Sequence, residues 1–416
     1  MIRPIIQGAI PIFNVGLRTG TLATRFALVF ILARYLDAAA IGYYGLFTAA
    51  IGYALLCFGL DLYVYTTREI TRVERAKQGR LLKSQAALVG ILYLLLAPAA
   101  LLILPWAGLP PGLIWWFLPI LVLEHLNQEI FRLLVILSRQ ITASVLLFIR
   151  QGSWAIAVAT LMTASEDLRN LHFVMSLWAG AGVLAALGGL WTLHALRLGG
   201  WNEVVDWAWV RKGITVSSAF LVATLSLRAI QTVDRFWLQE LARIEIVGAY
   251  VLFFGASSAL NVFLDAAIFS FRYPEMVVLG SEKLDELHGK TRLMALHTLG
   301  ACLLFAFASV LAMPTLLGWI GSEIYIAHLD LYYWVLAARI IYSLSMVPHY
   351  ALYALGRDRP LIASHLAGLG VFFITTLAFT QVSRPYAVPI GVLISMLVVL
   401  LWKSAAYLKM LFHGAH

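Results

Sequence analysis

Twelve apolar runs of membrane-spanning length divide this chain, and they restrict it to a helical protein built into a lipid bilayer. Each run has about 20 residues, the length that a helix needs to cross the hydrocarbon core. Lipid offers no hydrogen-bond partner to an exposed backbone, so we expect helices. Barrel strands would be shorter and would alternate in polarity over about ten residues. The runs lie at 12–34, 43–65, 84–106, 113–137, 141–164, 173–194, 214–238, 247–270, 292–317, 330–354, 360–381 and 385–408.

Composition agrees with this interpretation and excludes several classes of protein. Of the 416 residues, 62% are hydrophobic and 12% are charged, against roughly 45–50% and about 25% in soluble domains. Spans of this number leave only short loops, so the chain has no room for a separate soluble domain. The net charge of +9 is no signal for nucleic acid, because Lys and Arg beside spans follow membrane orientation and lipid charge.

The distribution of Lys and Arg between the two sets of loops predicts the orientation. With the N-terminus in the cytoplasm, 19 of these residues fall on the inner side and four on the outer side. Cytoplasmic loops carry the excess of positive charge in membrane proteins. We therefore expect a multi-pass membrane protein with both termini in the cytoplasm.

One polar helix face occurs twice in the sequence. Its residues follow the spacing i, i+4, i+7, i+11, which places them on one side of a helix. The first span carries Asn14, Arg18, Thr21 and Arg25, and the seventh carries Thr224, Arg228, Gln231 and Arg235. The next spans continue the parallel, with Gly42–Phe47 facing Gly248–Phe253 at an offset of 206. This predicts a duplicated protein with two six-helix lobes of the same orientation, residues 1–199 and 200–416, and a site between them.

Seven arginines but only five acids lie inside the predicted spans. An arginine at the bilayer centre costs roughly 2.5–3.5 kcal/mol, so water, ion pairs or a bound anion must offset that cost. The excess of positive charge predicts a wet, cationic cavity. Candidate residues for binding substrate there are Asn14, Arg18, Thr21, Arg25, Arg150, Arg228 and Gln231. Candidate gate or ion-coupling residues are Asp61, Glu124, Asp234, Arg235 and Asp265. The alternative for any of these charges is a purely structural ion pair.

Signals for catalysis, metals and cofactors are absent from the sequence. No Cys or His pair has zinc-site spacing, and Gly289-Lys290-Thr291 lacks the first glycine of a phosphate loop because position 284 is Leu. No outward loop exceeds about fifteen residues, which leaves little room for an external catalytic site. We expect no metal, no cofactor and no enzymatic activity.

Two passages, residues 32–72 and 234–276, resemble polysaccharide transporters of the Wzx-type O-antigen flippase family. This family belongs to the multidrug/oligosaccharidyl-lipid/polysaccharide (MOP) exporter superfamily. The first passage has the family's Gly-Tyr element and an acid, Asp61, that closes the second span. In the second passage, Asp234-Arg235, Val247–Tyr250 and Pro274 match the start of the second lobe.

The resemblance implies an all-α, MATE-like fold that works by alternating access. The implied cargo is an oligosaccharide linked to undecaprenyl diphosphate, moved from the cytoplasmic to the periplasmic leaflet. Arginine suits a diphosphate because its planar guanidinium makes paired contacts and stays charged. Implied partners are this lipid-linked oligosaccharide, membrane lipids and the glycan polymerase and chain-length proteins. Two alternatives remain open: a MATE-like multidrug antiporter, and a membrane enzyme of glycan assembly.

Overall fold

The computed structural model describes residues 2–280 and 283–413, and every regular element among these residues is a helix. Nine of the twelve apolar runs each coincide with a single helix, and the runs 43–65, 141–164 and 247–270 are each divided among consecutive helical segments, so the prediction of an all-α membrane protein is confirmed. Among the described residues, ten helices are long and apolar enough to cross a membrane, or eleven if the two parts of a bent helix count as one span. The one expected span that is not among these helices, 113–137, is the helix of 26 residues Pro111–Ile136. Its polar residues, among them Glu124, His125 and Asn127, face the protein interior.

The chain forms two compact units. One comprises residues 1–36 and 46–221, and the other comprises 37–45 and 222–416. The division at 221/222 falls inside a helix, whereas the lobe boundary expected from the sequence, 199/200, lies in the loop before that helix. The expected lobe boundary stays a prediction.

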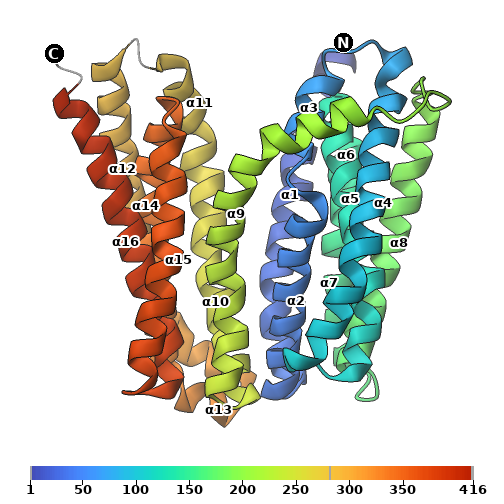
Figure 1. Cartoon of the computed structure of the whole chain (residues 1–416). Helices are drawn as coiled ribbons and strands as arrows, with labels where there is room; N and C mark the ends of the chain where they lie inside the picture. The colour runs from blue at the N-terminus through green and yellow to red at the C-terminus, as the bar shows by residue number, and fades with distance from the viewer. Residues whose placement is uncertain (1, 281–282, 414–416) are drawn as a thin grey trace. The chain divides into compact units, whose positions relative to one another are not determined.

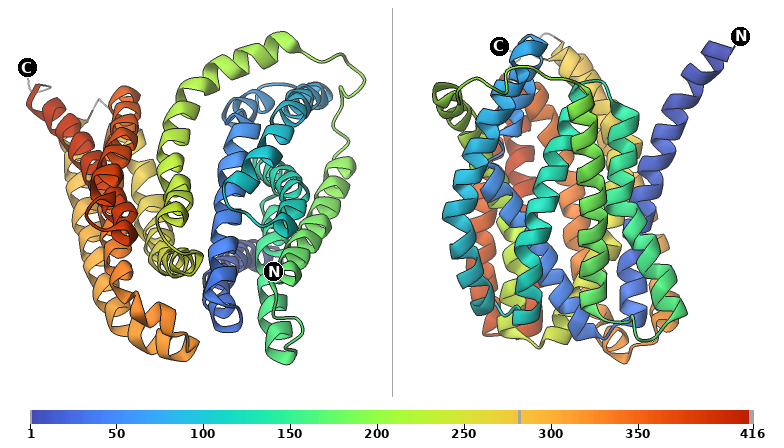
Figure 2. Two further views of the ribbon diagram at one scale, coloured as in Figure 1. Left: turned by 60° about the horizontal axis from the view of Figure 1, so that its bottom comes forward. Right: turned by 90° about the vertical axis from the view of Figure 1, so that its right-hand side faces the viewer.

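The first unit is a bundle of long helices that lie side by side (Figures 1 and 2). Its elements are α1 (Ile2–Tyr35), most of α2 (Ala38–Gly59), α3 (Tyr63–Ile70), α4 (Arg75–Trp106), α5 (Pro111–Ile136), α6 (Gln140–Phe148), the π-helical segment η1 (Ile149–Ser153), α7 (Trp154–Ala164), α8 (Leu171–Ala195) and the first part of α9 (Trp207–Leu241). Helix α1 packs on α6, η1 and α7, while α5 packs on α8.

The second unit repeats this pairing of helices (Figure 1). Its elements are the rest of α9, α10 (Ile244–Leu264), the π-helical segment η2 (Asp265–Phe269), α11 (Ser270–Leu279), α12 (Leu284–Ile320), α13 (Glu323–Ala327), α14 (Leu329–Ala354), α15 (Asp358–Thr380) and α16 (Arg384–His413). The fourth and sixth spans of the unit, α14 and α16, pack together as α5 and α8 do. Trp237 of α9 contacts Phe372 of α15, which pairs the first span with the fifth.

Local sequence explains where several helices begin and end. Proline fits the first turn of a helix because it lacks a backbone N–H, and α5 begins at Pro111. Helix α8 follows Asn170, whose side chain accepts a hydrogen bond of 2.9 Å from the N–H of Phe173. Helix α12 ends at Gly321, which has a φ of 75°, a conformation that glycine adopts without a steric penalty.

The turn between α2 and α3 has an unusual backbone. Leu60 and Asp61 both have a φ of 50°, in the left-handed region that normally favours glycine. This turn separates the long apolar helix α2 from the short helix α3, so the second predicted span, 43–65, ends earlier than expected.

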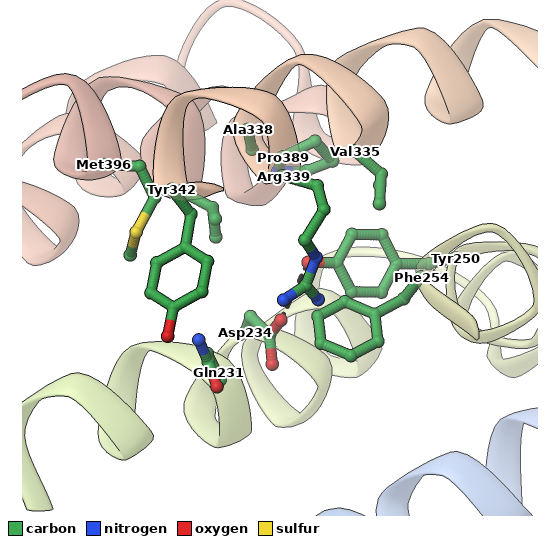
Figure 3. Close-up of a pocket in the computed structure, with 11 residues that line it drawn as sticks. Gln231, Asp234, Tyr250, Phe254, Val335, Ala338, Arg339, Tyr342, Pro389 and Met396 are labelled. Carbon is green, nitrogen blue, oxygen red and sulfur yellow. Dashed lines mark hydrogen bonds between the residues drawn. The ribbon is translucent and has the colours of Figure 1, made fainter. Parts of the chain in front are cut away.

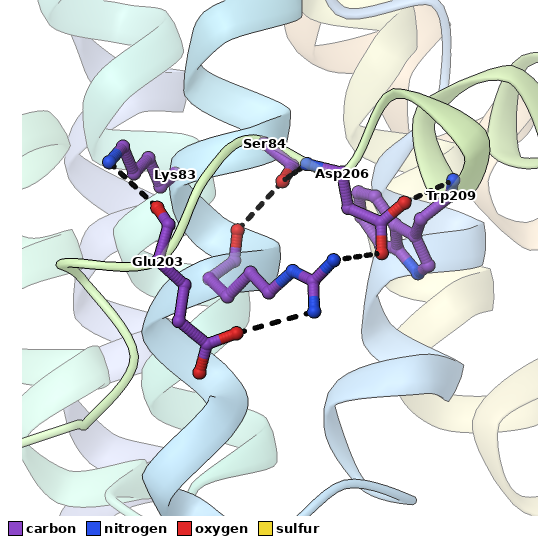
Figure 4. A network of polar contacts seen from close by, with 6 residues as sticks. Lys83, Ser84, Glu203, Asp206 and Trp209 are labelled. Atoms are coloured by element: carbon purple, nitrogen blue, oxygen red, sulfur yellow. Dashed lines mark hydrogen bonds and ion pairs between the residues drawn. The ribbon is translucent and has the colours of Figure 1, made fainter.

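A linker of residues 196–206 joins α8 to α9 and is fastened to α4 (Figure 4). The N–H of Gly79 donates to the carbonyl of Gly199 at 2.7 Å, and the N–H of Gly199 donates to the carbonyl of Arg75 at 3.1 Å. The guanidinium of Arg80 pairs with Glu203 at 3.2 Å and with Asp206 at 3.0 Å. Backbone and ionic contacts together hold this linker on the first unit.

Candidate functional site

The polar face of α1 points to the fifth span of the first unit. Nε of Arg18 donates to Oγ of Ser144 on α6 at 3.1 Å, and the same hydroxyl donates to Oδ1 of Asn14. Two turns farther along, Nη1 of Arg25 donates to Oε1 of Gln151 in η1 at 3.0 Å. Thr21 lies between them but donates to the carbonyl of Leu17 in its own helix. The expected shared face is therefore real, and three of its four side chains contact α6 or η1.

A glycine allows α1 to approach the π-helical segment this closely. A Cβ on Gly152 would lie 3.3 Å from Oγ1 of Thr24 and 2.7 Å from the ring of Phe148. The π turn inserts an extra residue into the span, which changes the direction of the side chains that follow. Gln151 reaches Arg25 from this turn, and Arg150 of the same turn is buried on another side.

Arg150 and Glu124 form an ion pair inside the first unit. Nη2 of Arg150 lies 3.6 Å from Oε2 of Glu124, and both residues are buried. The other carboxylate oxygen of Glu124 accepts a hydrogen bond of 2.8 Å from the indole of Trp178. Sequence analysis placed Arg150 in the cationic cavity and Glu124 at a gate. The structure pairs their charges with each other, and their roles in transport stay predictions.

The second unit contains a pocket around a buried carboxylate (Figure 3). Asp234 of α9 is 1% exposed and accepts a hydrogen bond of 2.7 Å from the hydroxyl of Tyr250 on α10. The pocket has a volume of about 20 Å³, room for a water molecule or a small ion. Its lining comes from α9, α10, α14 and α16: Gln231, Asp234, Tyr250, Phe254, Val335, Ala338, Arg339, Tyr342, Pro389, Val392 and Met396.

Two arginines share one aromatic ring at this pocket. Cζ of Arg235 and Cζ of Arg339 each lie 4.3 Å from the centroid of Phe254. Arg339 extends from α14 toward the side of the pocket that holds Asp234 (Figure 3), and it donates to Oγ of Ser258 at 3.3 Å. With two guanidinium groups beside one carboxylate, the pocket has an excess of positive charge. A guanidinium over an aromatic face gains on the order of 0.5–2 kcal/mol.

The remaining predicted residues lie at separate places. Arg228 is exposed and makes a long contact of 3.5 Å to Gln231. Asp265 is exposed at the start of η2, and Asp61 occupies the left-handed turn after α2. Asp234 and Arg235 are buried in the second unit, at 1% and 8% exposure. Within the described residues, no three His, Cys, Asp or Glu side chains group as a metal site.

Sequence analysis missed part of the pocket. Sequence analysis assigned no site role to Arg339, and it assigned none to Tyr250 or Phe254. Their spacing of four residues on α10 places both rings on one face, a signal that was available in the sequence. Lys403 is one of the 19 Lys and Arg residues that the sequence analysis counts on the inner side. It is completely buried inside the second unit.

Comparison with solved structures identifies the fold. An inward-facing multidrug resistance MATE family transporter of the MOP superfamily superposes with a TM-score of 0.68 at 14% identity, covering 93% of this chain and 95% of the other. The fold is that of the MATE transporters. A mutant of the Vibrio cholerae MATE transporter VcmN has a TM-score of 0.63 at 15% identity and covers 98% of both chains. A MATE protein in a bent conformation has a TM-score of 0.51 at 12% identity, with 97% of both chains covered.

The MATE fold confirms the expected architecture at a coarser level than the sequence resemblance. No protein-family model matches the chain. No curated protein matches it either. The structural matches agree with the expectation of a MATE-like fold, while the flippase family and its cargo rest on the sequence passages alone.

Proposed function

We propose that this chain is a flippase that moves an undecaprenyl-diphosphate-linked oligosaccharide across the bacterial cytoplasmic membrane by alternating access. The cargo would pass from the cytoplasmic to the periplasmic leaflet, with both termini of the protein in the cytoplasm. Membrane lipids surround it, and glycan polymerase and chain-length proteins are expected to act on its product. No covalent bond changes in this step, so no catalytic residue or cofactor is assigned.

One observation carries the proposal: three in-span arginines bond to neutral partners. Among the described residues, Arg18 bonds to Ser144, Arg25 to Gln151 and Arg228 to Gln231, and none of the three forms an ion pair. Their positive charge is therefore not cancelled by a carboxylate. A guanidinium whose partners are amide or hydroxyl groups can exchange them for a diphosphate, which makes stronger, charge-assisted hydrogen bonds.

Binding of purified protein to undecaprenyl diphosphate tests the proposal directly. Arg18→Ala, Arg25→Ala and Arg228→Ala should each weaken binding about tenfold, since a hydrogen bond to a charged group contributes roughly 1.5–3 kcal/mol. Arg72→Ala is the matched control, because Arg72 is exposed and pairs with Glu69 outside the predicted spans. Unchanged affinity in all three variants would refute the diphosphate site.

A multidrug antiporter is the second candidate, because multidrug resistance MATE transporters share the fold. Such an antiporter would use Asp61, Glu124 or Asp265 as its ion site. Glu124 is already paired with Arg150, which weakens this reading for that residue. Export of a cationic dye from proteoliposomes, lost in Asp265→Asn and unaffected by Arg18→Ala, would favour the antiporter over the flippase.

A further inference from the structure

Three basic side chains meet inside the second unit, where α14, α15 and α16 pack together. They are His349 on α14, His365 on α15 and Lys403 on α16. The two imidazole rings are stacked, with centroids 6.2 Å apart and planes inclined by 9°. Lys403 is 0% exposed and His365 is 6% exposed, and Lys403 lies near both imidazoles.

Four polar atoms of this basic triad lack hydrogen-bond partners among the described residues. Nζ of Lys403, both ring nitrogens of His365 and Nδ1 of His349 are buried without a partner among the described residues. The backbone of Ala223 on α9 faces the His365 ring without reaching hydrogen-bond geometry. Buried polar groups in proteins nearly always have partners, so four such atoms in one place require an explanation.

No carboxylate of the described residues neutralises the triad. Among the described residues, neither Lys403 nor either histidine takes part in an ion pair. The titratable and charged groups on the elements packed around it are engaged elsewhere. Tyr350 of α14 contacts Tyr273 and Phe269. Tyr407 of α16 bonds to His288 of α12 at 2.6 Å. On α9, Asp234 contacts Tyr250, and Arg235 contacts Phe254.

An unpaired ammonium in a dry interior costs several kcal/mol. The closed packing around Lys403 therefore fits a neutral amine beside two neutral imidazoles. When a proton binds, the charge has no counterion, and the stable response is to admit water. Helices α15 and α16 offer a path for that response because small residues hold them together. A Cβ on Gly368 would lie 2.6 Å from Val399, and Oγ of Ser395 donates to the Gly368 carbonyl at 2.7 Å.

We propose that Lys403, His349 and His365 form a proton-binding site, and that proton uptake opens the interface of α15 and α16 to water. The site lies within one unit and does not include the arginines assigned to the cargo. It goes beyond the proposed flippase function, because it holds for any cargo. It gives the second unit a way to change conformation with the proton concentration.

Hydrogen–deuterium exchange of the full-length protein in lipid nanodiscs tests this site at one fixed pH. Lys403→Arg introduces a permanent charge, so exchange in peptides from α15 and α16 should become about tenfold faster, which corresponds to about 1.4 kcal/mol. Lys403→Met keeps the site neutral and should match the natural protein. Lys409→Arg is the control, since Lys409 lies exposed farther along α16. Equal exchange in Lys403→Arg and Lys409→Arg would overturn the proposal.

A second measurement keeps the test decisive if Lys403→Arg does not fold. Exchange in α15 and α16 is compared between the natural protein and Lys403→Met, first at neutral and then at mildly acidic pH. Intrinsic exchange rates change equally in both proteins, so they cancel. Acid should speed exchange in the natural protein relative to Lys403→Met. An identical response of both proteins would show that Lys403 takes up no proton.

Discussion

Gly42 and Gly248 lie against each other where the start of α2 crosses α10. A Cβ on Gly248 would be 3.2 Å from the backbone nitrogen of Gly42 and would collide with the carbonyl oxygen of Ala38. A Cβ on Gly42 would lie 2.5 Å from the carbonyl oxygen of Ile244. These two glycines occupy equivalent positions of the proposed sequence repeat, at the offset of 206. Small residues of this kind allow helix backbones in membranes to approach closely.

Gly248→Ala should destabilise the second unit. The added methyl group meets backbone atoms, which cannot rotate away, so α2 and α10 must separate. The free energy of unfolding should fall by about 1–3 kcal/mol, measured by thermal unfolding in detergent. Gly300→Ala on α12 is the matched control, because its Cβ meets nothing within 4 Å. If both variants unfold at the same temperature, the helices do not cross this closely.

Hydropathy predicts the helices of this protein well, because span length and lipid contact depend on local sequence. Hydropathy does not distinguish burial in protein from burial in lipid, so the burial of Lys403 inside the second unit could not be predicted. The π turns at η1 and η2 leave no mark in an apolar pattern, so the contact of Gln151 with Arg25 could not be predicted. Which acid neutralises which arginine depends on packing between distant helices, as Glu124 and Arg150 show.

Glu124→Gln should be strongly destabilising. The amide can still accept a hydrogen bond from Trp178, but Arg150 loses its only ion-pair partner among the described residues. Removing one member of a buried ion pair costs about 3–5 kcal/mol. Thermal unfolding of the purified protein measures the loss. Glu166→Gln is the control, because the side chain of Glu166 is 85% exposed in its pair with Arg169. The double variant Glu124→Leu with Arg150→Met should recover most of the stability.

Phe254→Leu should weaken the pocket of the second unit. The change removes the ring that Arg235 and Arg339 share and keeps an apolar side chain in its place. Two lost cation–π contacts predict a fall of about 1–3 kcal/mol in the free energy of unfolding. Phe263→Leu on the same helix is the control, since Phe263 is 53% exposed. Equal unfolding temperatures for the two variants would mean that the ring does not stabilise the arginines.

Gly79→Ala should release the linker of residues 196–206 from α4. A Cβ at this position would lie 2.5 Å from the carbonyl oxygen of Gly199, so the hydrogen bond that holds the linker is lost. Trypsin cleavage at Arg197 should become about tenfold faster, corresponding to about 1.4 kcal/mol of weakened attachment. Gly90→Ala on the same helix has open space around its Cβ and serves as the control. Equal cleavage rates would contradict the fastening role of Gly79.

The turn at Leu60 and Asp61 has a consequence for how α2 and α3 can move. A left-handed conformation costs an L-residue roughly 1–2 kcal/mol, and here two such residues are adjacent. The folded protein therefore holds this corner in a backbone conformation of higher energy than continuous helix. Any rearrangement that straightened the corner into continuous helix would recover that energy, so the chain carries its own driving force for joining α2 to α3.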